Sequence, residues 1–120
     1  MNGWIGVDLD GTLAHYDGWK GATHIGAPVG PMLERVKRWL SDGRDVRIFT
    51  TRISHDGTPA RAEEAALATI AIVAWLRRHL GRDLPITNVK DYGMVELWGD
   101  RCVQVVPNTG ERVGVSTRGL

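Results

Sequence analysis

The stretch Ile5–Leu13, Ile-Gly-Val-Asp-Leu-Asp-Gly-Thr-Leu, constrains the fold more than any other part of the chain. Its apolar beginning predicts a buried strand over Gly3–Leu9. This strand ends in Asp8 and Asp10, and two carboxylates about 4 Å apart repel each other by roughly 4 kcal/mol at an intermediate dielectric. A divalent cation removes this cost, and Mg²⁺ prefers oxygen ligands of this kind. Because Gly11 lets the backbone turn and present amides to an anion, the stretch predicts a site that handles a phosphate ester.

Composition predicts an ordinary globular protein with one domain over residues 1–120. The formal net charge of +1 does not give the excess of positive charge that is typical of nucleic-acid or membrane binding. No apolar stretch is long enough to cross a bilayer, and we expect neither a signal peptide nor a membrane partner. The single cysteine, Cys102, fits a reducing, cytoplasmic location, and we expect it to be buried as a small apolar residue.

Segments typical of strands and helices alternate along the chain. This alternation predicts parallel βαβ units in an α/β fold, a Rossmann-like open sheet of about five strands flanked by helices. After the first strand, the predicted strands are Asp45–Thr50, Ile86–Val89, Met94–Trp98 and Val103–Val106, with Arg112–Val115 as a hairpin partner of the last. The predicted helices run from Pro31 to Leu40 and from Ala60 to Leu80.

Helical periodicity assigns a core face to each helix. In the first helix this face carries Met32, Val36, Trp39 and Leu40. In the second helix it carries Ala66, Ile70, Val73, Leu76 and Leu80. The connection over residues 14–29 is long, rich in glycine and contains Tyr16 and Trp19, which predicts a hairpin or flap beside the acidic pair.

Polar side chains stand at the ends of four predicted strands. These are Asp8 with Asp10, then Thr50, then Lys90 and then Asp100. Ligands of open parallel sheets bind outside the carboxyl ends of the strands, so we expect these side chains to meet in one crevice. A phosphoryl group must there be neutralised, oriented and attacked in line.

The chemistry of phosphoryl transfer predicts a role for each residue. Asp8 is the candidate nucleophile, and Asp10 the acid that protonates the leaving oxygen and later accepts a proton from water. Mg²⁺ would be held by the side chains of Asp8 and Asp100 and by the backbone carbonyl of Asp10. The predicted contacts to the phosphate come from Thr50, from the amides of Leu9 to Gly11, and from the ammonium group of Lys90.

Two assignments near the second strand stay open. Thr51 is an alternative to Thr50, because only one of two successive residues in an extended strand can face the phosphate. The polar side chains that follow are expected to be solvated surface, although a substrate could reach them: Arg52, His55, Asp56 and Arg61.

Asp8-Leu9-Asp10-Gly11-Thr12 resembles the first motif of the haloacid dehalogenase (HAD) superfamily. Ile48-Phe49-Thr50 is similar to the second motif, Lys90 to the third and Asp100 to the fourth. The resemblance implies a Mg²⁺-dependent phosphatase with a Rossmann-like core that acts through an aspartyl-phosphate. Because neither connection is long enough for a cap domain, it implies the capless type, close to small phage- or prophage-type phosphatases.

Gly99 departs from this pattern, because many small relatives have two acids in the fourth motif and here Asp100 alone must serve the metal. An open site suits a nucleic-acid end or a phosphoprotein, and a small metabolite if a second subunit closes the site; five tryptophans leave room for a homo-oligomer. An alternative function is a non-catalytic module that keeps the fold and binds phosphate or a partner. A receiver domain would carry its phospho-acceptor on a later strand, and a dinucleotide-binding domain needs a Gly-x-Gly-x-x-Gly after the first strand, which is absent.

Overall fold

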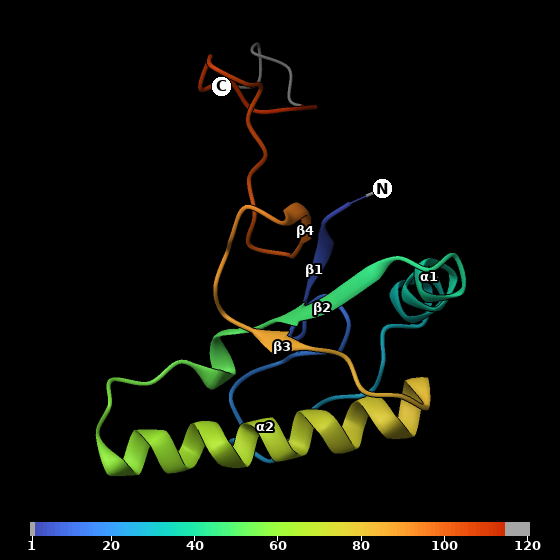
Figure 1. Ribbon diagram of the computed structural model, residues 1–120. Coiled ribbons are helices and arrows are strands. Elements are labelled where there is room, and N and C mark those ends of the chain that lie inside the picture. Colours follow the sequence, from blue (N-terminus) through green and yellow to red (C-terminus); the bar gives the residue numbers. More distant parts are fainter. Residues whose placement is uncertain (1, 115–120) are drawn as a thin grey trace.

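The computed structural model describes residues 2–114 and contains a four-stranded parallel sheet with the order β3-β2-β1-β4 (Figure 1). The strands are β1 (Trp4–Asp8), β2 (Asp45–Phe49), β3 (Ile86–Thr87) and β4 (Met94–Trp98). Two α-helices, α1 (Gly30–Ser41) and α2 (Pro59–Leu80), and the short 3₁₀ helix η1 (Thr51–Ile53) lie between the strands. The predicted α/β fold with an open parallel sheet is therefore present.

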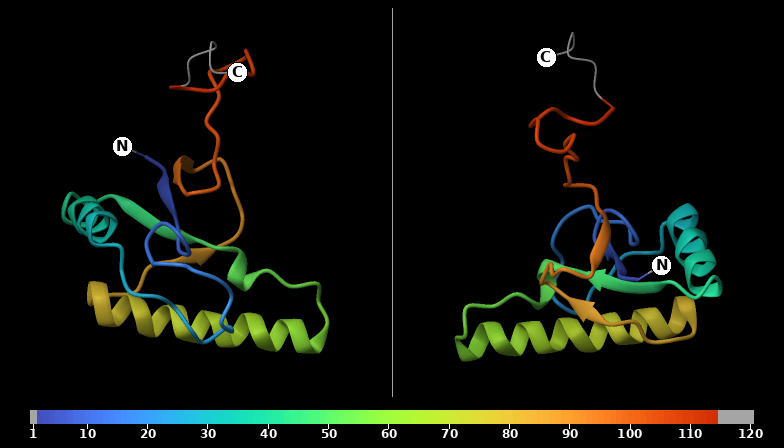
Figure 2. Two further views of the ribbon diagram at one scale, coloured as in Figure 1. Left: turned by 180° about the vertical axis from the view of Figure 1, so that it is seen from behind. Right: turned by 45° about the horizontal axis from the view of Figure 1, so that its top comes forward.

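The fifth strand predicted over Val103–Val106 is not part of this sheet. Val105 forms only an isolated antiparallel bridge with Arg112, and the amide of Val106 donates to the carbonyl of Glu111 at 2.7 Å. The segment leaves the body of the domain after β4 (Figure 2), so its β propensity finds no neighbouring strand to pair with. Val115, the end of the predicted hairpin partner, lies outside the described residues.

β1 is the central strand and organises the core. Val7 pairs with Ile48 of β2 on one side and with Trp98 of β4 on the other. The alternate side chains of Ile5 and Val7 in β1, and of Leu9 directly after it, are fully buried. They share one apolar cluster with side chains of both α-helices, Val36, Ile72 and Leu76 among them, so α1 and α2 cover the same face of the sheet.

No helix covers the opposite face within residues 2–114, and a crossing connection takes its place. The indole nitrogen of Trp4 donates to the carboxylate of Asp91 at 2.8 Å, and the Arg47 guanidinium lies 4.7 Å from the centre of the Trp4 ring. Asp91 belongs to residues 88–93, which return the chain from the carboxyl end of β3 to the amino end of β4. Because side chains alternate along a strand, Asp8 points to this face, away from the helices.

The core face predicted for α1 is confirmed: Met32 and Val36 are buried, and Trp39 and Leu40 pack partly buried against the core. The face predicted for α2 is only partly correct: Leu76 is buried and Leu80 packs against the core, whereas Ala66 is exposed and Ile70 is 66% exposed. The buried side chains of α2 are Ala65, Ala68, Ile72, Trp75 and Leu76.

α2 is apolar on several sides, so periodicity alone does not select one face. Contact with the rest of the chain does: the Trp75 indole donates to the carbonyl of Gly26 at 2.9 Å. α2 ends as expected at Gly81, whose φ of +71° suits a residue without a Cβ. Despite its 22 residues, α2 lacks the apolar content needed for a membrane crossing, and so does every other helix within residues 2–114.

We predict that Leu76→Ala lowers the free energy of unfolding by about 2–5 kcal/mol, because it leaves a cavity at a fully buried site. Leu67→Ala on the exposed side of the same helix is the matched control, with an expected change below about 0.5 kcal/mol. Urea unfolding followed by circular dichroism measures both changes. Equal losses in the two variants would contradict the burial described for α2.

Candidate functional site

A cavity of about 360 Å³ opens at the carboxyl ends of β1, β2 and β4. Four residues predicted from the sequence line it together, although they are far apart in the chain: Asp8, Asp10, Thr50 and Asp100. The rest of the lining includes Tyr16 and Trp19 from the connection after β1, Phe49 from β2, Arg52 from η1, Leu97 from β4 and Arg101 from the turn after β4.

The carboxyl groups of Asp8 and Asp100 are adjacent and share a hydrogen bond. Burial, and then the hydrogen bond and charge of Asp100, raise the pKa of Asp8 from 3.8 to about 7. The amide of Leu9 donates a hydrogen bond to the Asp8 carboxyl, which opposes this rise. Pairing of β1 with β4 brings the two acids together, because each stands just beyond the last paired residues of its strand.

Two glycines make room for this acidic pair. Gly11 has a φ of +81°, and a Cβ at this position would lie 2.8 Å from Cγ of Asp100. Any side chain at position 11 would therefore collide with the Asp100 carboxylate. A Cβ on Gly99 would lie 3.4 Å from Cβ of Asp8 and 3.1 Å from Sγ of Cys102. Gly99, the residue that departs from the fourth motif described above, thus lies directly beside Asp8.

Asp10 is held by Arg52, which the sequence predicted as solvated surface. Nε and Nη2 of Arg52 lie 2.7 Å and 2.9 Å from the two carboxylate oxygens of Asp10. The Arg52 side chain is only 4% exposed, so the prediction of a solvated residue is wrong. The cause is η1: the hydroxyl oxygen of Thr50 accepts the amide of Arg52 at 3.1 Å and turns the chain back over the cavity.

The flap predicted over residues 14–29 is present. Its two ends pair through Val29, whose amide donates to the carbonyl of Leu13 at 2.7 Å, and through His15, whose amide donates to the carbonyl of Ala27 at 2.8 Å. Arg52 fastens its middle, because the guanidinium lies 4.9 Å from the centre of the Trp19 ring. The flap therefore forms one wall of the cavity and is tied to η1.

Of the predicted contacts to phosphate, Thr50 is well positioned. Both Thr50 and its alternative Thr51 line the cavity. Thr50 is buried and directly follows β2, whereas Thr51 is exposed and begins η1. The amides predicted to bind phosphate have partners inside the chain: Gly11 donates to the carbonyl of Ala14 at 2.9 Å, and Leu9 to Asp8.

Lys90 does not line this cavity. β3 ends at Thr87, earlier than predicted, and residues 88–93 then return toward the amino end of β4, so the backbone has left the carboxyl rim by Lys90. Lys90 instead lines a neighbouring groove beside β4. Cys102, which was predicted to be buried, is exposed and borders both hollows, because it follows the turn at the end of the sheet.

The predicted magnesium site takes two side chains, those of Asp8 and Asp100, and the backbone carbonyl of Asp10. Within residues 2–114 no group of three or more histidine, cysteine, aspartate or glutamate side chains is arranged to hold a metal ion. The Asp10 carboxylate itself pairs with Arg52. The side chains of Asp8 and Asp100 remain available. Mg²⁺ is commonly bound through one or two carboxylates and keeps several waters, so this adjacent pair fits the ion.

Sequence reasoning gave no role in the site to Arg52, and it mentioned Tyr16 and Trp19 only as members of the predicted flap. The one signal for Arg52 was its place two residues after Thr50, the predicted end of the second strand. Comparison of the sequence with known protein families, with curated proteins and with solved structures gave no significant match.

We predict that stability depends on pH through Asp8. The pKa of Asp8 is about 7 in the folded chain and 3.8 ordinarily. Between pH 4 and pH 7 the folded state therefore holds a proton that the unfolded state has lost. The free energy of unfolding falls as the pH rises through this range. Without divalent cations, the free energy of unfolding of Asp8→Asn, measured relative to wild type, should rise by about 1–2 kcal/mol from pH 4 to pH 8. This is less than the full pKa shift corresponds to, because solvent screens a half-buried carboxyl.

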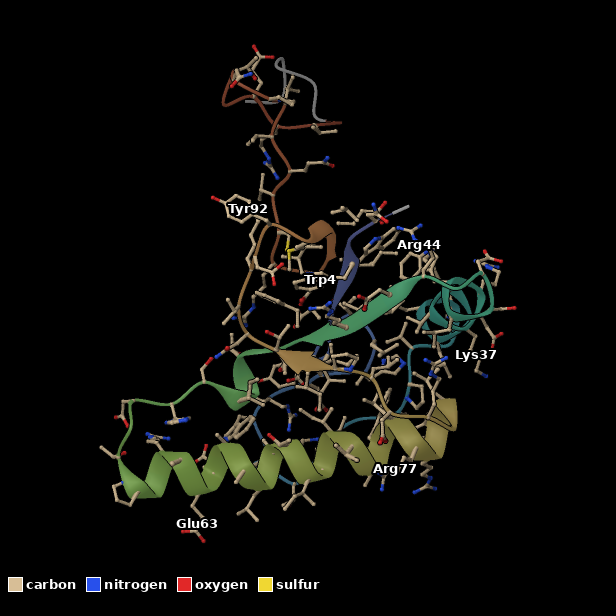
Figure 3. The ribbon with its side chains drawn as sticks, in the orientation of Figure 1. Trp4, Lys37, Arg44, Glu63, Arg77 and Tyr92 are labelled. Carbon is tan, nitrogen blue, oxygen red and sulfur yellow. The ribbon has the colours of Figure 1, made fainter. Side chains whose placement is uncertain are left out.

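Urea unfolding in EDTA at both pH values measures this difference. Glu63→Gln is the control, because it removes a carboxylate from the outer side of α2 (Figure 3) and should follow wild type at both pH values. A difference between Asp8→Asn and wild type that stays constant with pH would contradict the raised pKa.

Proposed function

We propose that the chain is a Mg²⁺-dependent phosphohydrolase that cleaves a phosphomonoester through a phosphoryl group carried on Asp8. The observation that carries this proposal is the adjacent pair of Asp8 and Asp100 in one cavity with Asp10 and Thr50. The resemblance of Asp8–Thr12 to the first motif of the HAD superfamily supports it, and we further propose a capless core of that type.

Asp8 would attack phosphorus, because it stands at the rigid end of the central strand and opens to the cavity. Its raised pKa means that the free site keeps a proton near neutral pH. When bound to Asp8 and Asp100, Mg²⁺ would favour the ionised carboxylates and reduce their repulsion from the substrate. Thr50 would donate its hydroxyl hydrogen to a phosphate oxygen, since its oxygen already accepts the amide of Arg52.

Asp10 would protonate the leaving oxygen, but Arg52 occupies both of its carboxylate oxygens in the described state. A phosphate dianion competes for the same guanidinium, because bidentate contacts to phosphate and carboxylate use the same fork of N–H groups. We expect substrate to draw Arg52 from Asp10 to the phosphate. Arg52 would then supply the positive charge for which the sequence suggested Lys90, and Asp10 would be free to exchange a proton.

A second candidate function is a phosphate-binding module without turnover. The observation that favours it is the same Asp10–Arg52 pair, which blocks the acid for as long as it persists. The two functions differ in one outcome, the release of inorganic phosphate from an ester.

We predict that the protein hydrolyses p-nitrophenyl phosphate with Mg²⁺ and not with EDTA, and that Asp8→Asn lowers kcat by about a thousandfold or more, since the nucleophile is lost. Asp42→Asn, an exposed acid just after α1, is the control and should keep full activity. Wild type that binds phosphate but hydrolyses none of a broad panel of esters would overturn the phosphatase and support the binding module.

We predict that Arg52→Ala lowers kcat/KM for the same ester by about ten- to a hundredfold, because charge-assisted contacts to the phosphate are lost. Arg52→Lys should recover only part of the loss, since a single ammonium cannot make a bidentate contact. Arg78→Ala, which removes an exposed arginine near the far end of α2, is the matched control. Unchanged kcat/KM in Arg52→Ala would show that the guanidinium does not reach the substrate.

A further inference from the structure

Two aromatic side chains of the flap line the cavity and are yet strongly exposed. Tyr16 is 42% and Trp19 52% exposed, while Phe49 of β2 and Leu97 of β4 contribute further apolar surface to the same cavity. Large exposed rings cost free energy in water, and they gather here at the mouth of the candidate site. The fold itself does not need them in this position, because neither belongs to the buried core.

In the described state the Trp19 ring lies near Asp10, with Arg52 between them. Arg52 lies against one side of it, 4.9 Å from the ring centre, and the same guanidinium binds Asp10. One guanidinium group therefore separates the ring from the acid assigned to the leaving oxygen. A group bonded to that oxygen would lie in the cavity that Trp19 and Tyr16 line together with Asp10.

Resting on the proposed phosphatase function, we infer that the leaving group of the substrate carries a flat aromatic ring, as in a nucleoside monophosphate. Base-like rings stack on tryptophan and tyrosine with little regard to sequence or substituents. A cavity of about 360 Å³ falls within the range that small ligands occupy. A sugar phosphate or glycerol phosphate would leave the aromatic wall without a matching partner.

The test compares nucleoside monophosphates with glycerol phosphate as substrates of wild type and variants. Wild type should prefer the nucleotides, and Trp19→Leu should lower the ratio of kcat/KM for nucleotide over glycerol phosphate by about tenfold, since one stacking contact is lost. Trp19→Phe keeps a flat ring and should restore most of the ratio. Tyr92→Leu removes an exposed aromatic side chain outside the cavity (Figure 3) and is the control, with no expected change for either substrate.

Equilibrium binding of adenosine monophosphate and of inorganic phosphate, measured in EDTA, separates this inference from the proposed function. Tighter binding of the nucleotide that weakens in Trp19→Leu supports the aromatic platform even if no ester is hydrolysed. Hydrolysis with equal kcat/KM for nucleotide and glycerol phosphate would overturn the platform and leave the phosphatase intact. A preference for the end of an oligonucleotide over the free nucleotide supports the same stacking and identifies its source as a nucleic-acid end.

Discussion

Two carboxyl groups held against each other, those of Asp8 and Asp100, are the constraint on which the rest of the site depends. Burial and mutual repulsion hold the pKa of Asp8 near 7, so the chain spends folding free energy to keep this pair together. Two features of the fold allow the two carboxyl groups to lie together. β1 and β4 pair in parallel, and the glycines at positions 11 and 99 leave room for both side chains. A fold that needed only stability would separate these acids, which is why the pair supports a role in binding a cation and a phosphate.

A second set of contacts joins three elements across the same cavity. Arg52 bonds the Asp10 carboxylate after β1, lies against Trp19 in the flap, and takes its position from the Thr50 hydroxyl at the end of β2. A substitution at any of these groups therefore changes the position of Arg52 relative to the other two. In the proposed reaction Arg52 binds the phosphate, and it lies between the acid Asp10 and the flap that contacts the leaving group.

The sequence was sufficient for features that depend on local pattern and on parallel topology. Apolar runs located β1, β2 and β4, and polar residues at strand ends predicted that Asp8, Asp10, Thr50 and Asp100 would meet. The sequence was insufficient where contacts between distant residues determine the structure. The bond from Trp75 to Gly26 orients α2, and η1 turns Arg52 toward Asp10. β3 is short, so the chain leaves the rim of the sheet before Lys90. Periodicity predicts none of these three features. The chemical roles of these residues remain predictions.

The position of β1 in the centre of the sheet has a consequence for the order of events during synthesis. Trp4 pairs with Met94, so β1 leaves the ribosome long before its second neighbour in the sheet, β4, has been made. Pairings between such distant residues slow folding and leave an apolar strand edge open to other chains in the meantime. The acids meet only when β4 pairs with β1, so the electrostatic cost of the site arises together with that pairing.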